Sequence, residues 1–126
     1  METKGAAKMS SYKELRVYER SYELAKEMYK LMGKLPREEM FGMISQIKRA
    51  ATSIPLNIAE GYGKGAGGKE LVRFLMMARG SCAEMEVLIS FCGDFGYFDE
   101  AQRKEYARSY EEIGKMLTAL IKTVNI

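Results

Sequence analysis

Apolar residues recur at alternating steps of three and four along four segments of the chain, which is the period of an amphipathic helix. In the first segment, Ser11 and Glu14 have the spacing of a capping box at the start. The stretch from Gly33 to Pro36 ends it. The predicted core-facing positions are Leu15, Tyr18, Tyr22, Ala25, Tyr29 and Met32.

The second segment starts near Arg37 and contains a proline. Pro55 removes the hydrogen bond to the carbonyl of Ala51, at a cost of about 3 kcal/mol if nothing compensates. The helix is therefore expected to kink or restart over residues 53–61. This irregularity either wraps the helix around the core or shapes a contact surface for another subunit or a ligand. The apolar positions are Met40, Ile44, Ile47, Ala51, Ile54 and Ile58.

The third segment begins near Lys69, and the fourth follows Asp99, which has Gln102 three residues on as in a capping box. Four long helices with short connections predict an all-α, up-down-up-down antiparallel four-helix bundle over residues 12–126. Residues 1–11 are expected to be a disordered tail. No segment alternates with period two, so no sheet is expected. The apolar positions are Leu71, Leu75, Ala78, Cys82, Met85, Ile89 and Cys92, then Tyr106, Tyr110, Ile113, Leu117, Leu120 and Val124.

Composition narrows the chemistry of this chain. Its 126 residues suffice for one domain, and it contains no histidine. The absence of histidine excludes Ser-His-Asp and Cys-His catalysis and argues against most zinc and haem sites. Glu84 and Glu86 are two residues apart on a helix and point in different directions. We therefore expect a protein that is not an enzyme, with no catalytic residue, metal or cofactor.

Cys82 and Cys92 lie ten residues apart in one predicted helix, a rise of about 15 Å. A disulfide needs Cα atoms within about 7 Å, so both are expected to be buried, free thiols in a reducing cytoplasm. No run of apolar residues is long enough to span a membrane. The amino terminus lacks the apolar core of a signal peptide. A cytoplasmic location without membrane contact is expected.

A glycine-rich segment joins the second and third helices. Gly63, Gly68 and Lys69 match part of a phosphate-binding loop. However, Glu70 stands where a serine or threonine would bind magnesium, and a helix rather than a strand precedes the loop. We expect a flexible connection, or a weak anion site where backbone N–H groups and Lys69 hold a nucleic-acid phosphate.

Positive charge concentrates between Ser45 and Arg79, although the whole chain has a net charge of only +3. This stretch is either a solvated face or a band that contacts phosphates. The candidate nucleic-acid contacts are Lys48, Lys64, Lys69 and Arg73. Alternatively, Arg49 and Arg79 form ion pairs between subunits with Glu60, Glu84 or Glu86. The candidate oligomer contacts are Arg49, Pro55, Asn57, Glu60, Arg79 and Glu84.

Eight tyrosines could stack on bases. Five of them fall on the predicted apolar seams, so core packing is the prediction for Tyr18, Tyr22, Tyr29, Tyr106 and Tyr110. The internal methionines occupy similar positions and are interpreted as core filler.

Several strings of the sequence together resemble one protein family. They are Tyr12-x-x-Leu15-x-Val17-Tyr18, Gln46-Ile47-Lys48-Arg49-Ala50-Ala51, Ser53-Ile54-Pro55-x-Asn57-Ile58-Ala59-Glu60-Gly61, Lys69-Glu70-x-x-Arg73-Phe74-Leu75 and Ala78-Arg79-Gly80-Ser81-x-x-Glu84. In this order they resemble the bacterial four-helix-bundle family encoded in intervening sequences of large-subunit ribosomal RNA genes. The resemblance covers about residues 12–124. Tyr18 stands where that family usually has tryptophan, and the loop from Gly61 to Gly68 is richer in glycine.

The resemblance implies a four-helix bundle that assembles into a homopentameric ring. It also implies kinship with the basic accessory proteins of diversity-generating retroelements, which bind nucleic acid and a reverse transcriptase. The first hypothesis is therefore a non-enzymatic homo-oligomer that binds RNA or DNA through phosphates without reading sequence. The alternative is a structural adaptor ring that binds a protein partner such as a reverse transcriptase.

Overall fold

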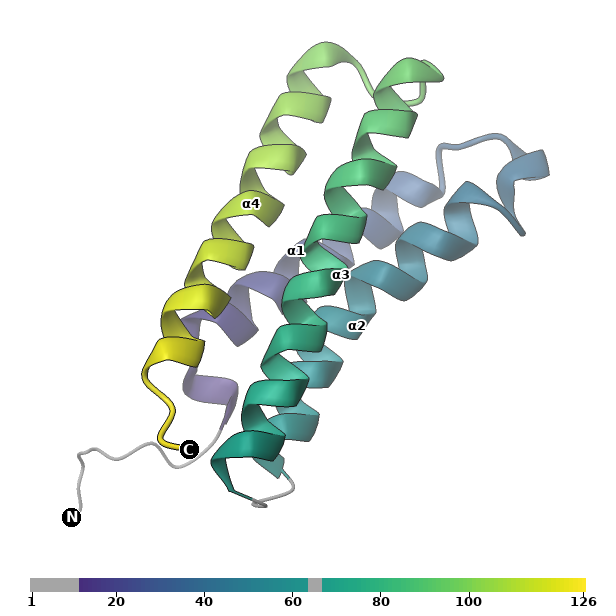
Figure 1. Cartoon of the computed structure of the whole chain (residues 1–126). Helices are drawn as coiled ribbons and strands as arrows, with labels where there is room; N and C mark the ends of the chain where they lie inside the picture. The colour runs from purple at the N-terminus through teal and green to yellow at the C-terminus, as the bar shows by residue number, and fades with distance from the viewer. Residues whose placement is uncertain (1–11, 64–66) are drawn as a thin grey trace.

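The computed structural model describes residues 12–63 and 67–126, and this part of the chain is helical without any strand (Figure 1). The all-α prediction is confirmed. Ser11 and the predicted tail of residues 1–11 lie outside the described residues. The elements are the 3-10 turns η1 (Tyr12–Glu14) and η2 (Arg37–Glu39), and the helices α1 (Arg16–Met32), α2 (Met43–Gly63), α3 (Gly68–Asp94) and α4 (Glu100–Lys122).

The starts of the last two helices match the sequence prediction closely. α3 begins at Gly68, one residue before the predicted position. At the start of α4, the Gln102 backbone N–H donates to Asp99 Oδ1 at 2.8 Å, and the Asp99 N–H donates to Gln102 Oε1 at 2.9 Å. This reciprocal pair is the predicted capping box, and it satisfies two backbone donors at the end of the helix.

The start of the second helix was predicted wrongly. Residues 37–39 form the turn η2, and α2 begins only at Met43. The physical reason is local: the Met43 N–H donates to Glu39 Oε1 at 3.1 Å, so a side chain in the preceding turn caps the first turn of α2. α2 then runs without interruption through Pro55, so the predicted restart does not occur.

Side-chain donors supply extra hydrogen bonds to the backbone around Pro55. The Ser53 hydroxyl donates to the Ala50 carbonyl at 2.7 Å, and the Asn57 amide donates to the Ser53 carbonyl at 2.8 Å. The Thr52 hydroxyl donates to a carbonyl one turn earlier at 2.8 Å. These bonds add donors to the stretch of α2 in which proline removes one.

Paired residues on neighbouring helices show how the helices lie against one another. Late residues of α2 face early residues of α3, and late residues of α3 face early residues of α4 (Figure 1). Polar pairs join α2 to α3, α3 to α4 and α1 to α4. They are Arg49 with Glu84, Ser53 with Ser81, Arg79 with Thr118, and Arg20 with Glu112.

Gly61 allows α2 and α3 to approach closely. A Cβ atom added at Gly61 would lie 2.9 Å from Leu71 Cδ1 and 3.0 Å from Phe74 Cβ. Atoms at such distances overlap, so a larger residue would force the helices apart. This packing gives a structural reason for the glycine that ends the Ser53–Gly61 string.

The core confirms the predicted faces of α3 and α4 but corrects that of α1. Every predicted apolar position of α3 except Leu71 is buried. On α1, Ala25 and Met32 are buried as predicted, and Leu15 and Tyr18 pack against the core. The rest of the buried face lies one residue away from the predicted positions, at Val17, Ser21, Leu24 and Met28. The predicted core residues Tyr22 and Tyr29 are 47% and 46% exposed. The methionine prediction holds in part, since Met28, Met32, Met43 and Met85 are buried whereas Met40, Met76 and Met77 are exposed.

Candidate nucleic-acid interface

The first turns of α3 place two of the predicted phosphate contacts together. Lys69 and Arg73 are both exposed and lie one turn apart. The Arg73 guanidinium pairs with Glu70 at 2.8 Å and lies 4.6 Å from the centre of the Phe74 ring. The hydrogen bond to Glu70 raises the pKa of Arg73. A phosphate that bound Arg73 would therefore have to displace a carboxylate, whereas Lys69 presents an exposed ammonium.

Lys48 lies apart from this pair. Its ammonium sits 4.8 Å above the Tyr29 ring, on the side of α2 that faces α1. The neighbouring Arg49 pairs with Glu84 at 2.6 Å, so this part of α2 lies beside Glu84 of α3. Glu84 follows Arg73 by eleven residues, or about 16 Å of helix. The predicted band is therefore two separate regions, and Lys64 lies outside the described residues.

The end of the chain packs against the start of α3. A Cβ atom on Gly68 would lie only 1.9 Å from the carbonyl oxygen of Asn125. That oxygen brings partial negative charge to the helix start, which opposes the predicted anion site there. Lys122 is exposed in the last turn of α4 and lies at the same end of the bundle. It is not among the candidate phosphate contacts predicted from the sequence. The alternating direction of the predicted helices could have indicated it, because this alternation brings the end of the fourth helix to the start of the third.

The candidate oligomer contacts fall into two groups. Arg49 and Arg79 bind residues of their own chain, namely Glu84 at 2.6 Å and Thr118 at 3.2 Å. Pro55 is buried, Asn57 is half-buried, and Glu60 is exposed. The Arg49–Glu84 pair, one of those proposed to lie between subunits, is formed within a single chain.

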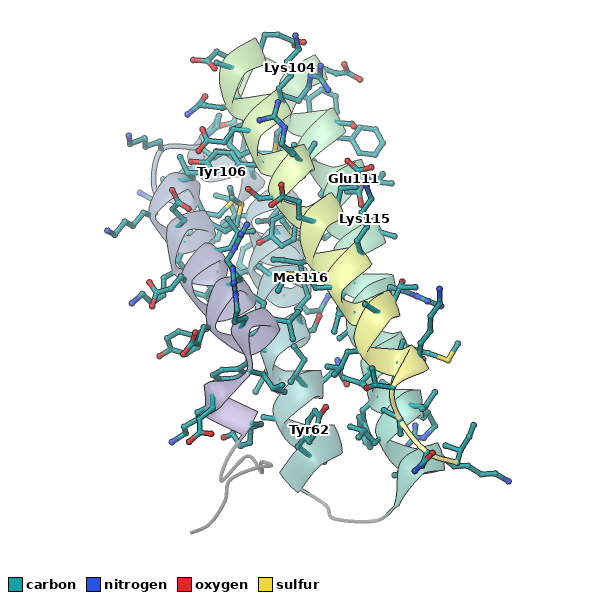
Figure 2. All side chains as sticks on the ribbon, turned by 90° about the vertical axis from the view of Figure 1, so that its left-hand side faces the viewer. Tyr62, Lys104, Tyr106, Glu111, Lys115 and Met116 are labelled. Carbon is teal, nitrogen blue, oxygen red and sulfur yellow. The ribbon has the colours of Figure 1, made fainter. Side chains whose placement is uncertain are left out.

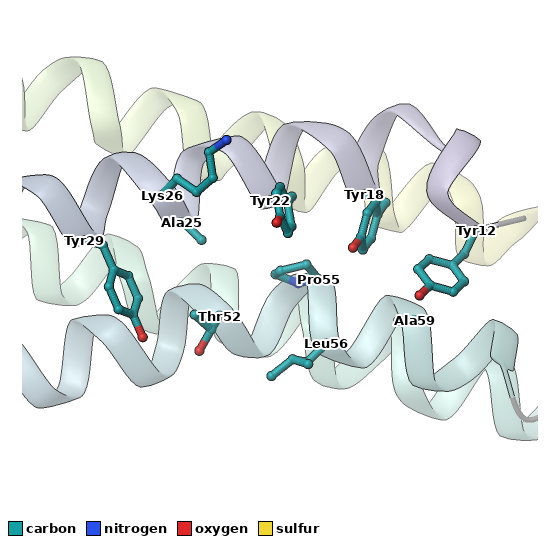
Figure 3. A pocket seen from close by; sticks show the side chains of 10 residues that line it. All are labelled: Tyr12, Tyr18, Tyr22, Ala25, Lys26, Tyr29, Thr52, Pro55, Leu56 and Ala59. Carbon is teal, nitrogen blue, oxygen red and sulfur yellow. The ribbon is translucent and has the colours of Figure 1, made fainter.

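A groove lies between α1 and α2. The helical period of the sequence does not reveal it, because that period places its tyrosines in the core. The groove encloses about 540 Å³, and Figure 3 shows tyrosines from η1 and α1 facing the Pro55 and Leu56 side chains of α2. Leu56 is 65% exposed. We call this surface the tyrosine groove; its lining residues are Tyr12, Tyr18, Tyr22, Ala25, Lys26, Tyr29, Thr52, Pro55, Leu56 and Ala59.

The buried cysteines are chemically quiet. Both are free thiols, as predicted. Burial, with a smaller effect of Glu86, raises the pKa of Cys82 to about 12. Burial, with a smaller effect of Glu39, raises the pKa of Cys92 to about 11. Since the thiolate is the nucleophile, neither thiol is activated for chemistry.

Within residues 12–63 and 67–126, no three His, Cys, Asp or Glu side chains come together as metal ligands could. Among the helices of the same ranges, none is both long and apolar enough to cross a membrane.

The helices and their exposed surfaces define a small all-α protein of the helical-bundle class. Residues 13–119 match the family model described as 23S rRNA-intervening sequence protein. The chain belongs to this family, which confirms the resemblance found in its motifs.

Solved structures are similar to the chain, and one of them is informative by its description. It is described as a protein with unknown function from the S23 ribosomal protein family, from Bacteroides thetaiotaomicron. The TM-score is 0.77 and the sequence identity is 29%, over 85% of this chain and 96% of that one. No curated protein matches the chain.

Proposed function

We propose that the protein is a non-enzymatic, cytoplasmic homo-oligomer that associates with RNA or DNA through phosphate contacts. The observation that carries this proposal is the exposure of Lys69 and Arg73 on the first turns of α3. Lys122 adds a third cation at the same end of the bundle. The proposed assembly is an up-down-up-down bundle repeated in a homopentameric ring, as the family resemblance implies.

The chemistry of these cations indicates a backbone contact. A lysine ammonium is a point charge that suits phosphate oxygens of any sequence. Arg73 would exchange Glu70 for a phosphate, because its guanidinium can bind either anion through two N–H groups. A ring would repeat this group of cations once in every subunit, so phosphate binding that is weak for one chain would be stronger for the assembly. Binding is therefore expected to depend strongly on salt and weakly on base sequence.

Fluorescence anisotropy with unrelated RNA and DNA fragments tests the proposal across a salt series. The Lys69→Ala variant is expected to weaken binding to all fragments alike. It should reduce the slope of log affinity against log salt by about 1 for each phosphate that the variant no longer binds. Lys115→Ala is the matched control, since Lys115 is an exposed lysine in the middle of α4, away from this end (Figure 2).

The absence of binding at low salt would contradict the proposal, as would the same slope in wild type and Lys69→Ala. The second candidate function is an adaptor that binds a protein partner. It is favoured by Phe41, whose side chain is 92% exposed at the other end of the bundle. A Phe41→Ser variant that loses a captured protein but keeps its salt slope would support this candidate.

A further inference from the structure

The exposed face of α3 forms a second apolar surface besides the tyrosine groove. Met76, Val87, Phe91 and Phe95 are between 45% and 56% exposed, and Phe91 stacks on Phe95 with ring centres 5.7 Å apart. Exposed apolar surface of this extent on a soluble helix indicates an interaction site. We call this surface the α3 ridge; its residues are Met76, Gly80, Ala83, Val87, Phe91 and Phe95, which follow helical steps of three and four.

Gly80 gives an independent indication that something approaches this ridge. It lies in the interior of a 27-residue helix, where glycine costs about 0.5–1 kcal/mol relative to alanine. A Cβ atom added there would meet no atom within 4 Å among the described residues. No contact within the described part of the chain therefore requires a glycine. A second backbone that packs closely on the ridge would require one.

The tyrosine groove and the α3 ridge have matching shapes. Along α1, the groove runs from Tyr18 to Tyr29, about 17 Å of helix, and is open to solvent at Tyr22, Tyr29 and Leu56 (Figure 3). The ridge from Met76 to Phe91 is about 22 Å long. One surface is concave between two helices, and the other is the convex face of a single helix. A helix face that enters a groove between two helices is an ordinary form of helix packing.

Their charges are also complementary. Between Met76 and Phe95 the chain has three carboxylates, Glu84, Glu86 and Asp94, and one cation, Arg79. Glu84 already pairs with Arg49 of α2 at 2.6 Å, so the acidic excess of this side comes from Glu86 and Asp94. The groove lining contains one charged residue, Lys26, whose ammonium lies 5.6 Å above the Tyr22 ring and 3.2 Å from Glu23. Lys48, outside the lining, lies above the Tyr29 ring on the α2 side. Pairing two grooves would bring lysines together, and pairing two ridges would bring carboxylates together. Only the pairing of groove with ridge brings opposite charges face to face.

We propose that the tyrosine groove of one copy takes the α3 ridge of the next copy. The inference rests on the homo-oligomeric part of the proposed function and names the two surfaces that form it. The surfaces share no residue, and in Figure 1 α3 lies toward the viewer while α1 lies behind it. Each chain can therefore use both surfaces at once. Contacts of this head-to-tail kind form a closed ring when the rotation permits, and an open filament otherwise.

Two variants that each disable one surface test the inference. Leu56→Glu places a carboxylate in the groove, where it would face the acidic ridge. Val87→Lys places an ammonium on the ridge, where it would face the groove lysines. Light scattering coupled to size exclusion is expected to find wild type assembled and each variant at the mass of one chain. An equimolar mixture is expected to form species of two chains or more, because one variant keeps its ridge, the other keeps its groove, and the introduced carboxylate and ammonium attract each other.

Control variants separate loss of the interface from loss of the fold. Ala119→Glu and Ala119→Lys make the same charge changes at an exposed position of α4 and should keep the wild-type mass. Gly80→Leu should keep or increase helicity by circular dichroism, since leucine favours helix more than glycine does. It should nevertheless weaken assembly at least tenfold, because its side chain blocks close approach.

Each alternative result overturns the inference in an identifiable way. If Leu56→Glu or Val87→Lys keeps the wild-type mass, the interface lies elsewhere. If the mixture stays at one chain where wild type assembles, the groove does not take the ridge. A Leu56→Glu variant that keeps its mass but loses RNA binding would make the groove a nucleic-acid surface instead. A wild type of one chain would remove the homo-oligomeric part of the proposed function as well, while leaving the salt-slope test of nucleic-acid binding independent.

Discussion

The Tyr110 hydroxyl provides a direct test of the packing inside the bundle. Tyr110 is fully buried on α4, and its hydroxyl has no hydrogen-bond partner among the described residues. Burial raises the pKa of this hydroxyl above its ordinary value. A buried hydroxyl without a partner costs about 1–3 kcal/mol, whereas phenylalanine keeps the ring and removes the polar atom. Allowing for the small void that is left, Tyr110→Phe is expected to raise the free energy of unfolding by about 1 kcal/mol.

Tyr106, one turn earlier on α4, is a matched control. Burial, and to a smaller extent the nearby Glu27 and Glu105 carboxylates, raise the pKa of Tyr106. Its hydroxyl, unlike that of Tyr110, is not a buried polar atom without a partner among the described residues. Figure 2 shows Tyr106 between α4 and α1. Tyr106→Phe therefore removes no buried hydroxyl that lacks a partner, and it is expected to leave the free energy of unfolding unchanged or to lower it by up to about 1 kcal/mol. The same chemical change should thus stabilise the fold at Tyr110 but not at Tyr106.

Urea unfolding followed by far-UV circular dichroism measures both effects. All variants must be compared at one protein concentration, because self-association adds to the apparent stability. Tyr110→Phe should move the midpoint to higher urea with the m-value unchanged, and Tyr106→Phe should leave it in place or move it lower. A loss of more than about 1 kcal/mol in Tyr110→Phe would show that its hydroxyl has a partner, and the described packing would be wrong.

Cys82 and Cys92 are expected to react with a thiol reagent at pH 8 far more slowly than in the urea-unfolded chain, because burial raises the pKa of both thiols above 10; equal rates would contradict their burial. Tyr97 donates to Glu39 at 2.6 Å, which lowers the pKa of Glu39 and raises the pKa of Tyr97 to about 12. This stabilisation should therefore be complete between the ordinary pKa values of 4.5 and 10.0. It should disappear as the pH falls through the lowered pKa of Glu39 or rises from 10 towards 12, and urea melts of Tyr97→Phe should lack this part of the pH dependence. Gly61→Ala should lower the free energy of unfolding by about 1–3 kcal/mol, since a Cβ atom there overlaps α3, and a thermal melt like that of wild type would refute this.

The helices that sequence alone predicted best are those with one apolar face. On α4, Ile113 and Leu117 are buried as predicted, and the Asp99–Gln102 capping box marks the start. The start of α2 was harder to predict. The 3-10 turn of residues 37–39 and a helix have similar local sequence preferences, and the choice depends on the contact from Glu39 to Met43.

The one-residue error on α1 has a physical cause. α1 has two neighbouring faces with helical period, one aliphatic with Val17 and Leu24, and one aromatic with Tyr22 and Tyr29. Periodicity cannot rank these faces, because a tyrosine can pack on the core or line a groove with its ring half exposed. The tertiary arrangement of α1 and α2 decides between them.

The candidate nucleic-acid site could be predicted only in part. Lys69 and Arg73 are close in sequence and lie together on α3. Lys48 was grouped with them because net charge along a sequence ignores which side of a helix each residue occupies. In the fold, Lys48 lies over Tyr29. Lys122 could not be found by the charge of a continuous stretch, because it is distant from Lys69 in sequence. The packing of α4 brings it to the end of the bundle where α3 begins.

The tyrosine groove has a spectroscopic consequence. The chain contains no tryptophan, and four of its eight tyrosines line this groove. Near-ultraviolet absorption and intrinsic emission of the protein therefore come from tyrosine, and half of these chromophores surround one surface. Whatever covers the groove transfers Tyr22 and Tyr29 from water to an apolar environment. Occupancy of the groove can thus be followed by tyrosine emission in the unlabelled wild-type protein, with a Tyr22→Phe/Tyr29→Phe variant to identify the responding rings.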